Sequence, residues 1–289
     1  MNLHAASSQR SLHSLSWLYG FSLLIATATF FLLVAGGLVT SHKAGLAVPD
    51  WPLSYGQWFP PMVGNIFWEH GHRMIAGLVG ILTLGFSIAV QIVEGRAWLK
   101  RLAWTAFGLV IVQALLGGLT VLTLLPTVVS AAHACAAQTF FCAVAAITYF
   151  LSPFYPDQAI GDSRLRRLAV MTTGWIYLQL VLGAMIRHSN VTVIPHVLVG
   201  LMVALHVLLL ASRIARFYSG EKVLARFSLG LGLLTVLQVF SGMGAFIFTR
   251  MLTGGYAPPS GEIFFTVLHQ TTGALILAVS VLVDIRVWR

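Results

Sequence analysis

Trp68-Glu69-His70-Gly71-His72-Arg73 marks the point where a polar loop turns into a long apolar run. Glu69 and His72 stand three residues apart, so a helix would place them on one face, roughly 60° apart. Ionisable side chains at the edge of a membrane span are costly in hydrocarbon and therefore indicate a functional site. The alternative is an interfacial belt, in which Trp68 anchors the helix and Glu69 pairs with Arg73.

The composition of the chain is that of an integral membrane protein. Of its 289 residues, 58% are hydrophobic and only 9% are charged, whereas soluble domains carry about 25% charged residues. The net charge of +9 could indicate a nucleic-acid partner. The basic residues, however, lie in short clusters between apolar runs, as membrane orientation requires. We therefore expect a lipid bilayer, and no nucleic acid, around this protein.

Eight apolar runs are long enough to cross a bilayer as helices, since a transmembrane helix needs about 20 residues. They lie near residues 16–39, 67–93, 102–122, 128–151, 168–187, 194–212, 227–249 and 264–284. The first run is too long for the apolar part of a cleaved signal peptide, so we expect it to be a retained span. The predicted fold class is an all-α integral membrane protein with eight transmembrane helices.

Lys and Arg are distributed unequally between the two ends of these spans. With the N-terminus inside, all but four of the 17 Lys and Arg residues lie on the inner side, the exceptions being Lys43, Arg73, Arg187 and Arg250. Cytoplasmic loops carry such an excess of positive charge. Both termini are therefore predicted to be cytoplasmic.

An internal repeat of four helices is visible. Gly37-Leu-Val-Thr-Ser-His42 ends the first span, and Gly183-Ala-Met-Ile-Arg-His188 ends the fifth with matching spacing. Because four is an even number, the two halves would run parallel. We predict two parallel-repeat four-helix bundles, residues 1–155 and 156–289. A Gln-x-x-x-Gly pattern, which we interpret as helix packing through small residues with an interhelical hydrogen bond, begins at Gln113, Gln179 and Gln238.

The even-numbered spans all run from outside to inside, and each carries one histidine near its outer end, namely His72, His133, His196 and His269. These four therefore lie in one layer close to the outer surface. Two facing imidazoles about 4 Å apart across an iron are the axial arrangement of a b-type haem. We predict two bis-histidine pockets, His72 with His133 and His196 with His269. One turn further on, a small residue would leave room for the macrocycle at Ala76, Ala137, Gly200 and Gly273.

Other uses of these side chains are weaker predictions. A zinc or copper site fits poorly, because the four histidines are divided between two halves and no thiolate or acidic cluster accompanies them. Arg73 and Arg187 lie at the outer edge, where guanidinium groups could pair with haem propionates or contact lipid headgroups. Three more histidines at the outer edge are interpreted as interfacial, and two cysteines as inert buried thiols, namely His42, His70, His188, Cys135 and Cys142.

The two halves differ in one respect that suggests a division of labour. Only the first half has a carboxylate, Glu69, one turn before its histidine, whereas Val193 and Thr266 occupy the matching positions in the second. A carboxylate beside a haem edge could stabilise developing positive charge or accept a proton. The second half therefore has the composition of a cofactor holder.

The chain resembles the heme A synthase family (bacterial type), the integral membrane enzymes that convert haem O to haem A for terminal oxidases. The resemblance rests on Gly36-Gly-Leu-Val-Thr, on Ala44-Gly-Leu-Ala-Val-Pro-Asp-Trp-Pro-Leu, on Glu69-x-x-His72-Arg73 and on the later single histidines. It covers essentially the whole chain. Many members carry two cysteines flanking Pro-Asp-Trp-Pro, where this chain has Val48 and Ser54. It is thus similar to a cysteine-free subtype.

The resemblance implies roles for the site residues. The N-terminal half would bind the substrate haem O through Glu69, His72 and His133, and His196 and His269 would ligate haem b, which passes electrons. A ring methyl group would be oxidised to a formyl group through hydroxylated intermediates, with Glu69 stabilising a cationic intermediate or handling protons. Partners would be haem O synthase and the assembling terminal oxidase, in the bacterial inner (plasma) membrane.

Two other functions remain open from the residues themselves. One is a diheme electron-transfer cytochrome acting on quinol, with haem b in both pockets. The other is a non-enzymatic membrane protein that binds or delivers haem. Glu69 distinguishes these functions from methyl oxidation, since a simple electron carrier needs no carboxylate at that position.

Overall fold

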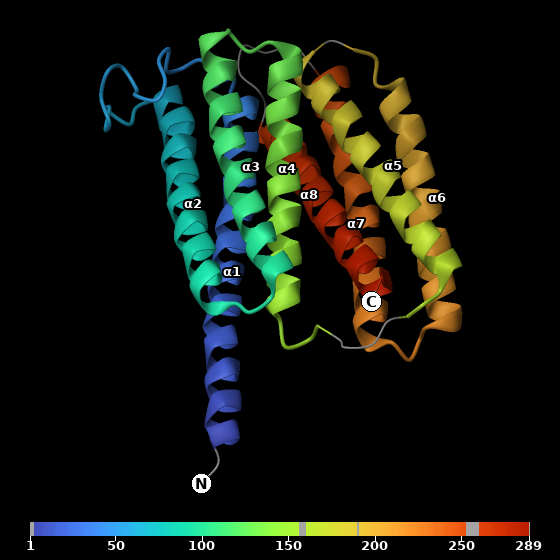
Figure 1. The fold of residues 1–289 in the computed structure, drawn as a ribbon. Helices are drawn as coiled ribbons and strands as arrows, with labels where there is room; N and C mark the ends of the chain where they lie inside the picture. The colour runs from blue at the N-terminus through green and yellow to red at the C-terminus, as the bar shows by residue number, and fades with distance from the viewer. Residues whose placement is uncertain (1–2, 156–159, 190, 253–259, 289) are drawn as a thin grey trace.

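The computed structural model describes residues 3–155, 160–189, 191–252 and 260–288. Eight helices make up this part of the chain (Figure 1), and α7 continues into a short π-helical turn, Ile247–Met251. The helices are α1 (Leu3–Ser41), α2 (Asn65–Val93), α3 (Ala97–Leu122), α4 (Thr127–Leu151), α5 (Ser163–His188), α6 (Ile194–Phe217), α7 (Lys222–Phe246) and α8 (Ser260–Trp288).

Each helix contains a segment that is long and apolar enough to cross a membrane. The predicted all-α membrane fold with eight spans is therefore confirmed. The helices extend a few residues beyond most of the predicted spans, because polar residues at their ends continue the helical hydrogen bonding outside the apolar run. Large apolar side chains on the outside, such as Ile81 at 71% and Val236 at 70% exposure, suit a surface that faces lipid.

The helices form two groups of four. In the first group, α1 contacts α2, α2 contacts α3, α3 contacts α4, and α4 contacts α1 again. In the second group, α5, α6, α7 and α8 contact one another in the same cyclic order. The groups meet where α1 contacts α8 and where α4 contacts α5 and α8. These contacts are the ones expected of two four-helix halves. The division at residues 155 and 156, and the equivalence of the halves as repeats, remain predictions.

Helices α4 and α8 form the centre of the bundle, as Figure 1 shows. In the most apolar part of each, 50% of the residues are buried, against 11% in α7. One hydrophobic core packs within α1–α4, and a second lies mainly within α5–α8 but also includes Leu33, Phe141 and Cys142 from the first group. The central helices therefore carry His133 and His269, and the peripheral helices α2 and α6 carry His72 and His196.

Candidate functional site

Each of the four histidines packs against a glycine of the preceding helix. The imidazole Cε1 lies so close to the backbone there that a Cβ would overlap or crowd the ring. The distances from Cε1 to the position of such a Cβ are 3.2 Å for Gly36–His72, 3.0 Å for Gly117–His133, 3.1 Å for Gly183–His196 and 2.8 Å for Gly242–His269. The four helix pairs therefore share one local arrangement at their outer ends.

The glycine of α1 in this arrangement is Gly36. The sequence repeat paired Gly37 with Gly183, and that register is wrong by one residue. Gly37 instead faces the side-chain amide of Gln270, which would lie 3.4 Å from a Cβ at that position. These two adjacent glycines thus contact different side chains, those of His72 and Gln270, and sequence spacing alone does not show which glycine contacts which side chain.

Backbone carbonyls fix the orientation of two of the imidazoles. The Nδ1 of His133 donates to the carbonyl oxygen of Gln113 at 3.2 Å, and the Nδ1 of His269 donates to that of Gln238 at 3.1 Å. Each carbonyl belongs to the residue four before the glycine, so the ring reaches it only because the glycine has no side chain. With the proton on Nδ1, Nε2 carries the lone pair, which can accept a hydrogen bond or bind a metal.

The glutamine side chains point at the same histidines. Their Nε2 groups donate from Gln113 to the His133 carbonyl at 2.9 Å, from Gln179 to His196 Nε2 at 3.1 Å and from Gln238 to His269 Nε2 at 3.4 Å. The predicted interhelical hydrogen bond is therefore confirmed. Its acceptor, which the sequence interpretation did not identify, is the histidine. The signal was present in the glycine that follows each glutamine by four residues.

The small residues one turn after the histidines have a different neighbour from the expected one. We expected them to leave room for a macrocycle. In the structure, Gly200 lies against the amide of Gln179 and Gly273 against that of Gln238, at 3.2 and 3.3 Å from the position of a Cβ. In the second half these glycines therefore admit the glutamines.

His196 and His269 face each other from diagonal helices of the second group. Their ring centroids lie 6.0 Å apart, with an angle of 70° between the planes. Two axial nitrogens about 4 Å apart across an iron, each about 1 Å from its ring centre, would put the centroids about 6 Å apart. Each ring can rotate about its iron–nitrogen bond, so the angle is compatible. The donor set and spacing of this pair therefore fit a haem iron.

His72 and His133 also come from diagonal helices, α2 and α4, and interact electrostatically. Their pocket differs from the second one at His72. Leu32 stands four residues before Gly36, where the other three pairs have a glutamine. The buried Nδ1 of His72, like that of His196, has no hydrogen-bond partner among the described residues. The orientation of His72 is thus less constrained than that of His133 or His269.

Glu69 is buried, with 4% exposure, and both of its oxygens are engaged. Oε1 pairs with Arg73 Nη2 at 2.5 Å, and Oε2 accepts from the backbone N–H of Val48 at 2.8 Å. Arg73 Nη1 donates in turn to the carbonyls of Asp50 at 2.8 Å and Leu53 at 3.0 Å. The ion pair of the interfacial alternative is therefore present, and it ties α2 to the first outer loop. A role for Arg73 with haem propionates stays a prediction.

The Pro-Asp-Trp-Pro loop folds back onto the first group of helices. The indole of Trp51 lies against Gly118 of α3, the neighbour of the glycine that contacts His133, at 2.6 Å from the position of a Cβ. Ser54 Oγ bonds His70 Nδ1 at 2.7 Å. Backbone N–H groups of Gly56 and Tyr55 donate to Asp50, and the Gly56 bond in particular holds the pKa of that carboxyl below its usual value.

The positions where the resembled family often has cysteines are both part of these contacts. Val48 supplies the N–H that binds Glu69, and Ser54 supplies the hydroxyl that binds His70. Hydrogen bonds from α2 thus hold the loop at the two positions, Val48 and Ser54, where a cysteine pair would stand.

Arg187 joins both groups of helices at the outer end. Its Nη2 donates to Ser41 Oγ of α1 at 2.5 Å, and that hydroxyl lies 3.0 Å from Thr266 Oγ1 of α8. Its predicted pairing with haem propionates is not tested by these contacts and stays a prediction. Ser41 was not singled out in the sequence, and Thr266 was noted there only as the position that matches Glu69.

Two of the remaining histidines, His42 and His206, have local partners. His42 stacks on Trp68 with ring centroids 4.1 Å apart, and His206 Nδ1 donates to the Met202 carbonyl at 2.8 Å. Both cysteines are free thiols. Within the described ranges, no group of three or more His, Cys, Asp or Glu side chains could hold a metal ion. A haem iron needs only axial ligands from the protein, so a haem site does not require such a group of three.

Gly242→Ala is expected to weaken haem retention strongly, because its new Cβ would stand 2.8 Å from His269 Cε1 and push the ring out of place. Overpacking of this kind costs about 1–3 kcal/mol, and about 1.4 kcal/mol is tenfold in affinity. Haem content per purified protein measures the effect. Gly230→Ala is the matched control on α7, where nothing lies within 4 Å of the new Cβ. Equal haem content in both variants would contradict the prediction.

Comparison with known proteins gives one family. A family model described as "Cytochrome oxidase assembly protein" matches residues 63–195. The chain is 30% identical to proteins named Heme A synthase from Geobacillus thermodenitrificans, over 184 residues, and Geobacillus kaustophilus, over 186. A third Heme A synthase, from Symbiobacterium thermophilum, is 31% identical over 180 residues. The matches cover 57–61% of this chain, and the chain spans only 57–58% of the length of these relatives.

Proposed function

We propose that this protein is a heme A synthase, because residues 63–195 match the family model and because proteins of that name are about 30% identical to it. It is an oxidoreductase that converts a ring methyl group of haem O to the formyl group of haem A through hydroxylated intermediates. The observation that carries this proposal is the His196–His269 pair, whose ring centroids lie 6.0 Å apart. That spacing suits two axial ligands of one iron.

The two pockets take different haems in this proposal. His196 and His269 would hold haem b, because the Nδ1–H bond of His269 to the Gln238 carbonyl leaves the lone pair on Nε2, where an iron would take the place of the Gln238 amide. Haem b, when bound, supplies one-electron redox chemistry. His72 and His133 bind the substrate haem O, and His72 lacks the glutamine that the other three histidines face. A less constrained ligand suits a group that must enter and leave.

Glu69 and Arg73 act at the edge of the substrate pocket. Glu69 lies one helical turn before His72 on the same face of α2, and its carboxylate is paired with Arg73. Its negative charge would stabilise positive charge that develops on the oxidised carbon. The Arg73 contacts fix the position of that carboxylate and of the loop above it.

The setting of the enzyme follows from the charge distribution and the family. It lies in the bacterial inner (plasma) membrane with both termini in the cytoplasm, since the basic residues are concentrated at that end. Haem O synthase would supply its substrate, and an assembling terminal oxidase would receive its product. The second candidate, a diheme cytochrome that oxidises quinol, is favoured by the shared glycine–histidine arrangement of the two halves.

Pigment extraction from the purified protein tests the proposal, using cells that also make haem O. We expect haem b together with haem A or a hydroxylated haem O. Two equivalents of haem b alone would favour the electron-transfer cytochrome. Unmodified haem O with no oxidised product, even after added oxidant and prolonged incubation, would favour a haem-delivery protein.

A further inference from the structure

A cavity of about 370 Å³ lies at the end of the bundle opposite the histidine layer, where the two groups of helices meet. Its walls come from α1, α4, α7 and α8. Among the described residues, the backbones of α1 and α4 make no direct contact with α7. The ring contact of Tyr149 with Phe227, at a centroid distance of 5.4 Å, spans this gap. The cavity therefore lies between the two groups of helices, at a place where α1 and α4 do not pack directly against α7.

One end of this cavity is polar. Tyr149 is only 6% exposed, and its hydroxyl and that of Ser152 are buried without a hydrogen-bond partner among the described residues. Arg226 also lines the cavity, whereas Arg286, which interacts electrostatically with Tyr149, is paired with Glu221. Buried polar groups nearly always have a partner. Two hydroxyl donors in a cavity that the Arg226 guanidinium also lines indicate a ligand with anionic acceptor oxygens.

The rest of the cavity is apolar. Leu23, Ala26, Phe141, Ala145 and Leu282 line it along the helices towards the membrane interior. Its volume lies within the range of pockets that hold small organic ligands. A ligand that matches both ends carries an anionic oxygen-rich head and a hydrocarbon chain. Basic pockets between transmembrane helices on the cytoplasmic side take anionic lipid headgroups.

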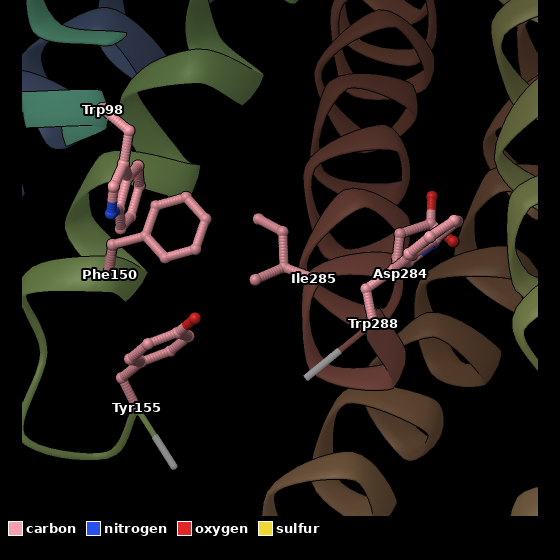
Figure 2. A pocket seen from close by; sticks show the side chains of 6 residues that line it. All are labelled: Trp98, Phe150, Tyr155, Asp284, Ile285 and Trp288. Carbon is pink, nitrogen blue, oxygen red and sulfur yellow. The ribbon is translucent and has the colours of Figure 1, made fainter. Parts of the chain in front are cut away.

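A second cavity, of about 380 Å³, opens at the same boundary but has the opposite polarity. Figure 2 shows Trp98, Phe150 and Tyr155 on one side of it and Asp284, Ile285 and Trp288 on the other. The charged group among its lining residues is the carboxylate of Asp284, and negative charge there would disfavour an anionic ligand. The two cavities therefore offer a comparison within one molecule.

We propose that the first cavity binds an anionic phospholipid of the inner leaflet. The phosphate accepts hydrogen bonds from Tyr149 and Ser152 and pairs with Arg226, and an acyl chain lies along Leu23 and Leu282. The bound lipid fills the boundary between the two groups of helices and holds them together. This site is separate from the histidine layer and does not depend on the haem chemistry.

Native mass spectrometry and thermal unfolding of the full-length protein test this site, with phosphatidylglycerol and phosphatidylcholine as the added lipids. We expect phosphatidylglycerol to remain bound and to raise the unfolding midpoint, and phosphatidylcholine to do neither. Arg226→Gln and Tyr149→Phe should each weaken the binding about tenfold, as expected for the loss of one charge-assisted hydrogen bond. Arg216→Gln, at another exposed arginine of the same end, and Asp284→Asn, in the second cavity, should bind as the wild type does.

Several outcomes would overturn the proposal. One is equal binding of the two lipids, and another is unchanged binding in both Arg226→Gln and Tyr149→Phe. Inorganic phosphate that stabilises the protein as well as the lipid does would show that only an anion is bound. An isoprenoid quinone as the retained molecule would assign the cavity to a different class of ligand. Because the readouts are lipid binding and unfolding, they remain informative whether or not the protein makes haem A.

Discussion

His196→Ala is expected to remove nearly all bis-histidine haem from the second group of helices. The imidazole faces His269 at a ring-centroid distance of 6.0 Å, so its loss leaves an iron in that pocket with a single axial ligand. The absorption spectrum of the purified protein should lose the low-spin component that this pocket contributes, and haem A production should stop because electrons would no longer leave through it.

His206→Ala is the matched control for this variant. It lies on the same helix, is buried, and donates Nδ1–H only to the Met202 carbonyl within its own helix. Its haem content and spectrum should match those of the wild type. Millimolar imidazole in the buffer should partly restore the low-spin spectrum of His196→Ala, because it can refill the space of the lost ring. A His196→Ala protein with unchanged low-spin haem would exclude His196 as a ligand.

Two substitutions at Glu69 are expected to separate its chemical role from its structural one. Glu69→Ala breaks a buried ion pair, which typically costs 3–5 kcal/mol, and we expect about 3 kcal/mol because loop carbonyls still hold Arg73. Glu69→Gln retains an oxygen that can accept from the Val48 N–H but removes the charge. Both should abolish haem A while leaving the haem b spectrum largely intact, but only Glu69→Ala should release the loop.

Haem A content and limited proteolysis of the first outer loop measure these two effects. Glu94→Gln is the control, because Glu94 is also buried and paired with an arginine, Arg96, but lies at the opposite end of α2. It should leave haem A production and loop protection unchanged. Wild-type haem A production by Glu69→Gln would assign Glu69 to the loop alone, and the chemical role would be wrong.

The sequence by itself determined the class of the protein and which residues are candidates for its site. Apolar runs of about 20 residues require helices in a bilayer, because every backbone polar group must be satisfied within the segment. The eight spans follow from this, and so does the layer of His72, His133, His196 and His269 near one surface. The motif around Glu69, whose residue types and spacing are specific, lies within the segment that matches the family model.

Only the tertiary structure decided what each of these residues touches. Spacing showed that glycines and glutamines recur, but it could not show that each glycine makes room for a histidine or that Gly36 takes this role in α1. Nor could it show that both oxygens of Glu69 are bound, by Arg73 and by the Val48 N–H. The period of a helix defines its faces, whereas the neighbour that each face meets depends on how the helix is rotated and packed against others.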